Sequence, residues 1–186
     1  MPLHADFCGD FRSQLSLALV SAGESHSFAL DRQGRAWGWG RNLEGQLGLG
    51  DERSRWRPCL LRTLAEQVCV RHIAAATIHS AAIGWDGSVY TWGVDAGGRL
   101  GHGDGLAISL PQRVQGLACV HVQEIAAGRE HTLFKLADGR TLSCGKGVHT
   151  HIVSQGVEGD ALPPAEKAKT PVPTDIFACL MPPRGA

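Results

Sequence analysis

The sequence predicts an all-β fold built from a repeated four-stranded unit, and three observations support this prediction. The stretches VSAGESHSFALDRQGRAWGWG, IAAATIHSAAIGWDGSVYTWG and IAAGREHTLFKLADGRTLSCG begin at Val20, Ile73 and Ile125, which gives periods of 53 and 52 residues. Each stretch alternates small or apolar residues with polar ones around a turn signal, a pattern typical of β-hairpins. No segment shows the 3.6-residue spacing of an amphipathic helix. Such repeats are typical of β-propeller blades.

The strands of the first unit can be placed in order along the chain. SHSFAL and GRAWGWG flank the turn DRQG and predict a hairpin. A loop is expected over residues 41–56, because this segment is rich in glycine and charge. Apolar runs near PCLL and VCVRHIAAA then complete one unit and begin the next. The same order recurs in the second unit.

The repeat is strongest at glycines and tryptophans. The motif GQLGLGD at 45–51 returns as GRLGHGD at 98–104. It resembles a nucleotide-binding loop, but a helix does not follow it, so we expect a structural role. The repeated positions predicted to form turns or to pack between blades are Gly34, Trp39, Gly40, Gly45, Gly48, Gly50, Gly87, Trp92, Gly93, Gly98, Gly101, Gly103, Gly139 and Gly145.

The repeat region is predicted to span residues 17–148. Its units cover about 17–69, 70–122 and 123–148, and the third is incomplete because Cys144 replaces the repeated tryptophan and the G-x-L-G motif does not return. Residues 1–16 are expected to be an N-terminal extension. Residues 149–186 hold six of the nine prolines and are predicted to form a flexible tail.

Composition limits the function classes. Lys plus Arg and Asp plus Glu number 18 each, so no net charge favours nucleic acid or an anionic membrane. No run approaches the 18 apolar residues of a membrane span. Of the six cysteines none forms a C-x-x-C pair, and we expect reduced thiols and an intracellular location, cytoplasmic, nuclear or both.

The motifs together resemble a known repeat. A G-x-x-H-[ST] turn, a D-G hairpin, [WY]-x-W-G and G-Q-L-G-x-G-D are similar to the repeat of the regulator of chromosome condensation family, over residues 17–148. That family closes a ring of about seven blades, so the resemblance implies a partial seven-bladed-type β-propeller with two full repeats and one incomplete repeat. Open blade edges are then expected to drive self-association.

The resemblance implies a non-enzymatic protein-interaction module. The first alternative is guanine-nucleotide exchange on a Ran-like small GTPase, and the second is a chromatin or nucleic-acid adaptor. In the family, the turn before each repeat histidine faces the GTPase. The corresponding candidate partner-facing residues are Glu24, His26, Ile78, His79, Arg129, Glu130 and His131.

Two further groups of residues are candidate sites. Arg53, Arg55, Trp56 and Arg57 form a candidate basic loop, for which a solvated inter-blade loop is the preferred interpretation, and nucleic acid is not expected as a partner. The three repeat histidines belong to different blades at one ring level, so each imidazole is expected to bond its own turn backbone rather than a metal. We predict no catalytic residue, cofactor or metal.

Overall fold

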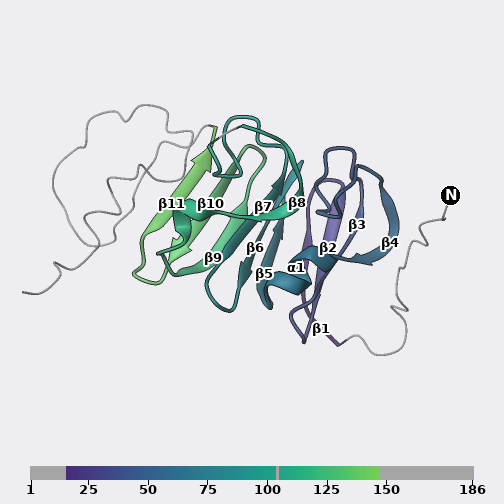
Figure 1. Ribbon diagram of the computed structural model, residues 1–186, viewed down its shortest axis with the longest axis horizontal. Helices are drawn as coiled ribbons and strands as arrows, with labels where there is room; N and C mark the ends of the chain where they lie inside the picture. The colour runs from purple at the N-terminus through teal and green to yellow at the C-terminus, as the bar shows by residue number, and fades with distance from the viewer. Residues whose placement is uncertain (1–15, 104, 147–186) are drawn as a thin grey trace, which may run out of the picture.

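The computed structural model describes residues 16–103 and 105–146, which form three antiparallel sheets that stand side by side (Figure 1). Blade 1 has the strand order β1 (Leu17–Ala22), β2 (His26–Asp31), β3 (Ala36–Gly40) and β4 (Arg55–Leu60). Blade 2 follows the same order with β5 (Val70–Ala75), β6 (His79–Gly84), β7 (Val89–Gly93) and β8 (Ile108–Arg113). Blade 3 contains β9 (Val122–Ala127), β10 (His131–Leu136) and β11 (Thr141–Gly145).

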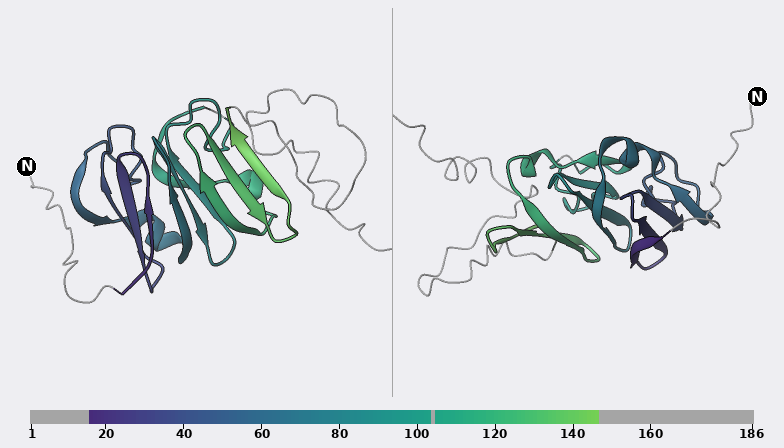
Figure 2. Two further views of the ribbon diagram at one scale, coloured as in Figure 1. Left: turned by 180° about the vertical axis from the view of Figure 1, so that it is seen from behind. Right: turned by 90° about the horizontal axis from the view of Figure 1, so that it is seen from below.

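The chain is therefore all-β in architecture, and its sheets are those of a partial β-propeller. Within each blade every strand pairs with its neighbour in sequence, and the three blades fan out without closing a ring (Figure 2). The strand boundaries follow the sequence period: β2, β6 and β10 begin at His26, His79 and His131. The predicted N-terminal extension, apart from Ser16, and the predicted proline-rich tail lie outside the described residues.

Two details differ from the sequence prediction. A short helix α1 (Arg62–Gln67) and a 3-10 turn η1 (Gln115–Leu117) follow the fourth strands, where no helix was expected. Each is too short to show a 3.6-residue period, and each buries one leucine, Leu64 or Leu117. The loop predicted over 41–56 is also shorter, because β4 already begins at Arg55.

The repeated glycines occupy backbone conformations that other residues avoid. All those named above have positive φ, between 71° and 119°. Gly40, at the end of β3, shows why a side chain is excluded. A Cβ atom there would lie 2.5 Å from the carbonyl oxygen of Ser25, in the turn before β2. The turn before β2 and the end of β3 thus approach each other closely only because residue 40 has no side chain.

The hydrophobic core consists of two seams between blades. Seam 1–2 joins blades 1 and 2 through a cluster that includes Phe28, Leu30, Leu61, Leu64, Ile73, Ala82, Tyr90 and Trp92. Seam 2–3 joins blades 2 and 3 through Ala81, Ile83, Val89, Val114, Leu117, Val122, Ile125, Phe134, Leu136, Leu142 and Cys144, with Ala74. Each blade is a single sheet, so its apolar faces are buried only by a neighbouring blade.

The outermost strands carry proline at equivalent positions, Pro58 in β4 and Pro111 in β8. Proline cannot donate a ladder hydrogen bond, so these edges resist pairing with another strand. Within the part of the chain that the structure describes, no helix is long and apolar enough to cross a membrane.

Candidate functional site: the seam histidines and the loop rim

The repeat histidines link adjacent blades. His26 Nε2 lies 2.9 Å from Ser80 Oγ in blade 2, and Ser80 Oγ donates a 2.8 Å hydrogen bond back to the carbonyl oxygen of Gln46 in blade 1. The next seam repeats the arrangement. His79 Nε2 lies 2.9 Å from Thr132 Oγ1, which donates to the carbonyl oxygen of Arg99 at 2.7 Å.

Both imidazoles are neutral in these seams. Burial lowers the pKa of His26 to about 4 and that of His79 to about 3; for His79 the nearby Arg99 adds to the effect. Because each hydroxyl donates its only proton to a carbonyl, each Nε2 must be the donor to the hydroxyl oxygen. Nδ1 then carries no proton, and it has no hydrogen-bond partner among the described residues in either histidine.

This geometry corrects two expectations for the histidines. The imidazoles of His26 and His79 bond a hydroxyl of the next blade, not the backbone of their own turn. Both residues are buried, so neither faces a partner. Only His131, in blade 3, is half-buried. Among the described residues, no group of His, Cys, Asp and Glu is arranged to hold a metal ion.

The turns before the histidines do reach the surface. Glu24, Arg129 and Glu130 are exposed, and Ile78 is half-buried. The structural register shows which residues of the three turns are equivalent, because the carbonyls of Ser25, Ile78 and Glu130 each accept from the backbone N–H of the residue after the third strand. Glu24 is therefore equivalent to Thr77 and Arg129, so the acidic residues of the first and third turns are not at the same position.

The long loops that follow β3 and β7 lie beside these turns. Arg41 N donates to Ser25 O at 2.8 Å, and Val94 N donates to Ile78 O at 3.0 Å. We call the resulting edge, along the upper side of Figure 1, the loop rim; it comprises residues 23–25, 41–44, 76–78, 95–97 and 128–130. The opposite edge carries the β2–β3 and β6–β7 turns and α1.

The first loop of the rim exposes an apolar side chain between paired charges. Leu43 is 59% exposed, and on either side of it Arg41 and Glu44 form an ion pair of 2.6 Å. Arg99 links the parts of the rim that belong to blades 2 and 3. Its guanidinium donates to the carbonyl oxygens of Ala96 in blade 2 and Arg129 in blade 3, at 2.7 and 2.9 Å. The rim thus carries an exposed apolar side chain on a loop of a rigid scaffold, the kind of segment on which binding residues are often found.

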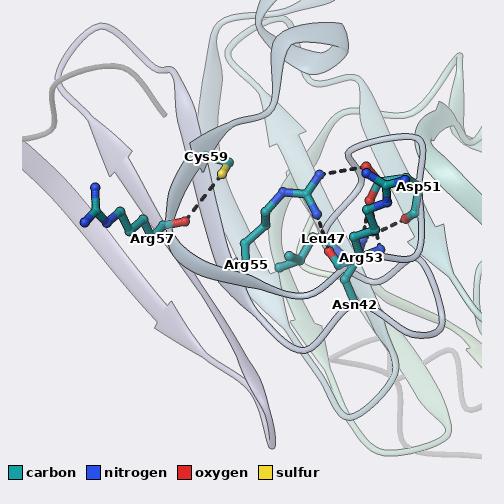
Figure 3. Close-up of polar contacts among 7 residues, drawn as sticks. All are labelled: Asn42, Leu47, Asp51, Arg53, Arg55, Arg57 and Cys59. Atoms are coloured by element: carbon teal, nitrogen blue, oxygen red, sulfur yellow. Dashed lines mark hydrogen bonds and ion pairs between the residues drawn. The ribbon is translucent and has the colours of Figure 1, made fainter. Parts of the chain in front are cut away.

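The base of this loop is closed by an asparagine that the sequence analysis missed (Figure 3). Asn42 Oδ1 accepts from Leu47 N at 2.8 Å, and its Nδ2 donates to Asp51 O at 2.7 Å. In blade 2, Asp95 Oδ1 accepts from Leu100 N at 2.7 Å in the same way. The signal was available, because residues 42 and 95 are one repeat period apart and both have short side chains that accept from backbone N–H groups.

The arginine side chains of the candidate basic loop do not lie together. Arg55 is tied to Asp51 by a 2.7 Å ion pair, and its side chain is mostly buried. The Arg57 side chain points away from those of Arg53 and Arg55 (Figure 3). Trp56 is 96% exposed on β4. Alternate residues of a regular strand would point the same way, but the register of β4 with β3 shifts between Arg55 and Cys59, so Arg55 and Arg57 do not.

Comparison with known proteins identifies the repeat. The family model "Regulator of chromosome condensation (RCC1) repeat" matches residues 33–83 and 86–134, and a second model of that description matches residues 18–46. The chain belongs to the regulator of chromosome condensation (RCC1) repeat family. Its resemblance to that family, expected from the motifs, is thus confirmed.

The chain spans only a small part of the length of the relatives that it matches. The human probable E3 ubiquitin-protein ligase HERC4 is 43% identical over 129 residues, which are 69% of this chain and 12% of that protein. Among solved structures, Prp20p from Saccharomyces cerevisiae is 28% identical with a TM-score of 0.62, and the match covers 72% of this chain and 34% of Prp20p. The match to human WBSCR16 has a TM-score of 0.67 and 24% identity, and it covers 74% of this chain and 34% of the WBSCR16 chain. This match supports the fold alone.

Proposed function

We propose that this RCC1-repeat chain is a non-enzymatic protein-interaction module that binds its partner through the loop rim. The observation that carries the proposal is the loop of blade 1, where Leu43 is 59% exposed on a segment closed by Asn42. A rigid loop loses little conformational entropy on binding, so exposed apolar area there contributes efficiently to affinity. The repeat supplies the rigid support, and the loops supply the contact surface.

The charges on the rim indicate the chemistry of a partner. Exposed Glu24 and Glu130 and half-buried Glu44 alternate with the exposed Arg41 and Arg129. A mixed-charge surface around an apolar anchor suits a folded protein with both acidic and basic side chains better than a polyanion. We therefore expect partner binding to depend on Leu43 and to weaken only moderately with salt.

The test is affinity purification of partners with the full chain, followed by direct binding to each purified candidate. Leu43→Asp should weaken binding by about tenfold or more, because a charge replaces the apolar anchor. The matched control is Trp85→Asp, which places the same charge at an exposed apolar position on the opposite edge. Equal binding by wild type and Leu43→Asp, or equal loss in both variants, would refute the rim as the contact surface.

A second candidate function is guanine-nucleotide exchange on a Ran-like small GTPase. It is favoured by the solved structure of Prp20p, a protein described by its binding to Gsp1p and histones, and by the exposed carboxylates Glu24 and Glu130 on the rim. Release of a fluorescent nucleotide from a panel of GTPases should accelerate with the chain present and return to the basal rate with Glu24→Ala/Glu130→Ala. No acceleration with any GTPase leaves the interaction module as the function.

The adaptor alternative draws little support from the arginines, which point in different directions.

We also propose an intracellular location. Cys59, Cys69, Cys119 and Cys144 are free thiols, and Cys144 is buried in seam 2–3, where burial raises its pKa to about 12. Such a thiol packs as a small apolar group and does not form disulfides.

A further inference from the structure

Trp85 belongs to neither seam and lies away from the loop rim. It is 67% exposed in the turn between β6 and β7, on the edge opposite the rim (Figure 1). We call this edge the turn edge; it comprises the turns 32–35, 85–88 and 137–140 and the residues that contact them. Blades 1 and 3 have Arg32 and Ala137 at the equivalent position, so the repeat does not require an aromatic ring there.

An arginine holds the Trp85 ring from one side. The guanidinium carbon of Arg71 lies 5.9 Å from the centroid of the ring, a cation–π contact. Arg71 Nη2 also donates to the carbonyl oxygens of Val122, at 3.2 Å, and of Gln123 in blade 3. Blades 1 and 3 have Ala18 and Gln123 where blade 2 has Arg71, so this arginine is not part of the repeat either. Together the two side chains form a platform that is attached to both blades.

The turn that carries Trp85 is fixed by its own hydrogen bonds. Trp85 N donates to the carbonyl oxygen of Cys69 at 2.9 Å. Asp86 Oδ1 accepts from Ser88 N at 3.0 Å and from Ser88 Oγ at 2.6 Å. A ligand that stacks on Trp85 therefore meets an ordered turn, and little conformational entropy is lost from the protein when it binds.

Arginine side chains beside the platform are available to a ligand. Neither Arg71 nor Arg113 forms an ion pair with another described residue. Arg71 uses only Nη2 in its bonds to blade 3, so Nε and Nη1 can still donate. The His121 ring lies against the same turn, where a Cβ atom at Gly87 would be 2.8 Å from its Nδ1. Guanidinium groups beside an aromatic ring suit a ligand that combines carboxylates with an apolar side chain.

The carboxylates near the platform are already engaged. Hydrogen bonds from Ser88, followed by the charge of Arg113, lower the pKa of Asp86. Glu124, in β9, pairs with Lys135 at 2.8 Å. The two arginines and the lysine thus outnumber the two carboxylates, and the surface around Trp85 attracts anionic groups.

We propose that the turn edge binds a linear acidic peptide, with an apolar side chain stacked on Trp85 and carboxylates bonded to Arg71 and Arg113. One exposed ring suits one apolar side chain, whereas proteins that bind single-stranded nucleic acid offer aromatic rings to successive bases. The chain has no net charge, which also favours a peptide over a polyanion. Because Leu43 lies on the opposite edge, this site is independent of the loop rim and leaves the rim open to its own partner.

A fluorescein-labelled peptide of six glutamates around a central leucine is the probe, titrated with the full chain and followed by fluorescence anisotropy. Trp85→Ala and Arg71→Gln should each weaken binding about tenfold, because they remove the stacking surface and a charged donor. Arg113→Gln, which breaks no contact between blades, should weaken it about threefold, and added salt should weaken it further. The indole N–H signal of Trp85, assigned by its loss in Trp85→Ala, should shift during an NMR titration.

The matched control variant is Leu43→Asp, which should bind the probe like the wild type. Control peptides carry lysine in place of glutamate, or glycine in place of leucine, and each should bind about tenfold more weakly. Thermal unfolding of each variant checks that its fold persists. The proposal is wrong if the probe does not bind saturably, if Trp85→Ala binds it unchanged, or if Leu43→Asp abolishes binding. A deoxythymidine decamer that binds more tightly than the peptide would instead assign the turn edge to nucleic acid and likewise overturn it.

Discussion

Seam 1–2 and seam 2–3 use the same hydrogen-bonding plan but fill their volume with large side chains at different positions. In seam 1–2 the large side chains are Phe28 from blade 1 and Trp92 from blade 2, and Ala82 lies between the blades as a small residue. In seam 2–3 the equivalents of these three are Ala81, Cys144 and Phe134. Cys144 thus stands in seam 2–3 where seam 1–2 has Trp92, and Phe134 stands where seam 1–2 has Ala82.

The comparison separates what the repeat must conserve from what it can exchange. The loop carbonyl of Arg99 accepts from Thr132 Oγ1 and, at 3.2 Å, from Cys144 Sγ, as the carbonyl of Gln46 accepts from Ser80 and Trp92. The polar contacts cannot move, because buried donors and acceptors need partners. Apolar volume can move between neighbouring positions, because packing requires only that the space be filled.

The largest effect is expected from removing the aromatic ring of seam 1–2. Trp92 is completely buried, contacts Phe28 edge-to-face at 5.8 Å between ring centroids, and donates to Gln46 O. Trp92→Ala should lower the free energy of unfolding by about 3–5 kcal/mol, because it leaves a large cavity. Urea denaturation measures this. A loss below that of Cys144→Ala in the other seam would contradict the assigned roles.

The second prediction concerns the loop that supports Trp92. Gly48 has φ 73°, and a Cβ atom there would lie 2.8 Å from Trp92 Nε1. Gly48→Val should therefore destabilise by about 2–4 kcal/mol through backbone strain and overpacking, while binding per folded molecule at the loop rim is unchanged. Gly139→Val is the matched control, because Gly139 has φ 86° with nothing near its Cβ position. Equal melting temperatures for the two variants would show that the contact with Trp92 adds nothing.

The exchange of volume can be tested directly in seam 2–3. Cys144→Trp should cost about 1–3 kcal/mol, because Phe134 already fills the space that Ala82 leaves open in seam 1–2. Adding Phe134→Ala should recover part of that loss, although Phe134→Ala alone is strongly destabilising. A double-mutant cycle measures the coupling. Strict additivity would mean that the two positions do not share one volume.

A dependence on pH, which needs no substitution, is also expected from both seams. His26 and His79 have pKa values of about 4 and about 3 in the folded chain, below the value of about 6.5 in an unfolded one. The unfolded state then binds more protons between these limits. Stability should be fully present above pH 6.5 and fall toward pH 4, by up to about 1.4 kcal/mol per pH unit and histidine.

The control for this titration is His79→Gln, which keeps a hydrogen-bond donor but does not titrate. It should flatten the fall in stability between pH 6.5 and 4 relative to wild type, measured by urea denaturation at each pH. An unchanged slope would show that His79 does not supply the acid sensitivity. Carboxylates such as Asp31, whose pKa is lowered by hydrogen bonds and charge from Arg35, affect stability at lower pH than the histidines.

Much of the fold follows from the sequence because it depends on short-range patterns. The period, the hairpin turns and the glycines with positive φ are local requirements, and the residues that satisfy them recur at fixed spacing. The family could be recognised for the same reason. The helix α1 escaped prediction because six residues are too few to show a period, and it forms where Leu64 packs into seam 1–2.

The candidate site depended on contacts between blades, which a sequence does not display. Glu24 and His26 are two residues apart, yet one is exposed and the other buried, because the next blade covers only the histidine. Likewise, the irregular register between β3 and β4 separated Arg55 from Arg57. Local patterning thus determined the strands, turns and repeat of this chain. Only tertiary structure decided which of the equivalent residues became core and which became surface, since burial of a blade face requires a neighbouring blade.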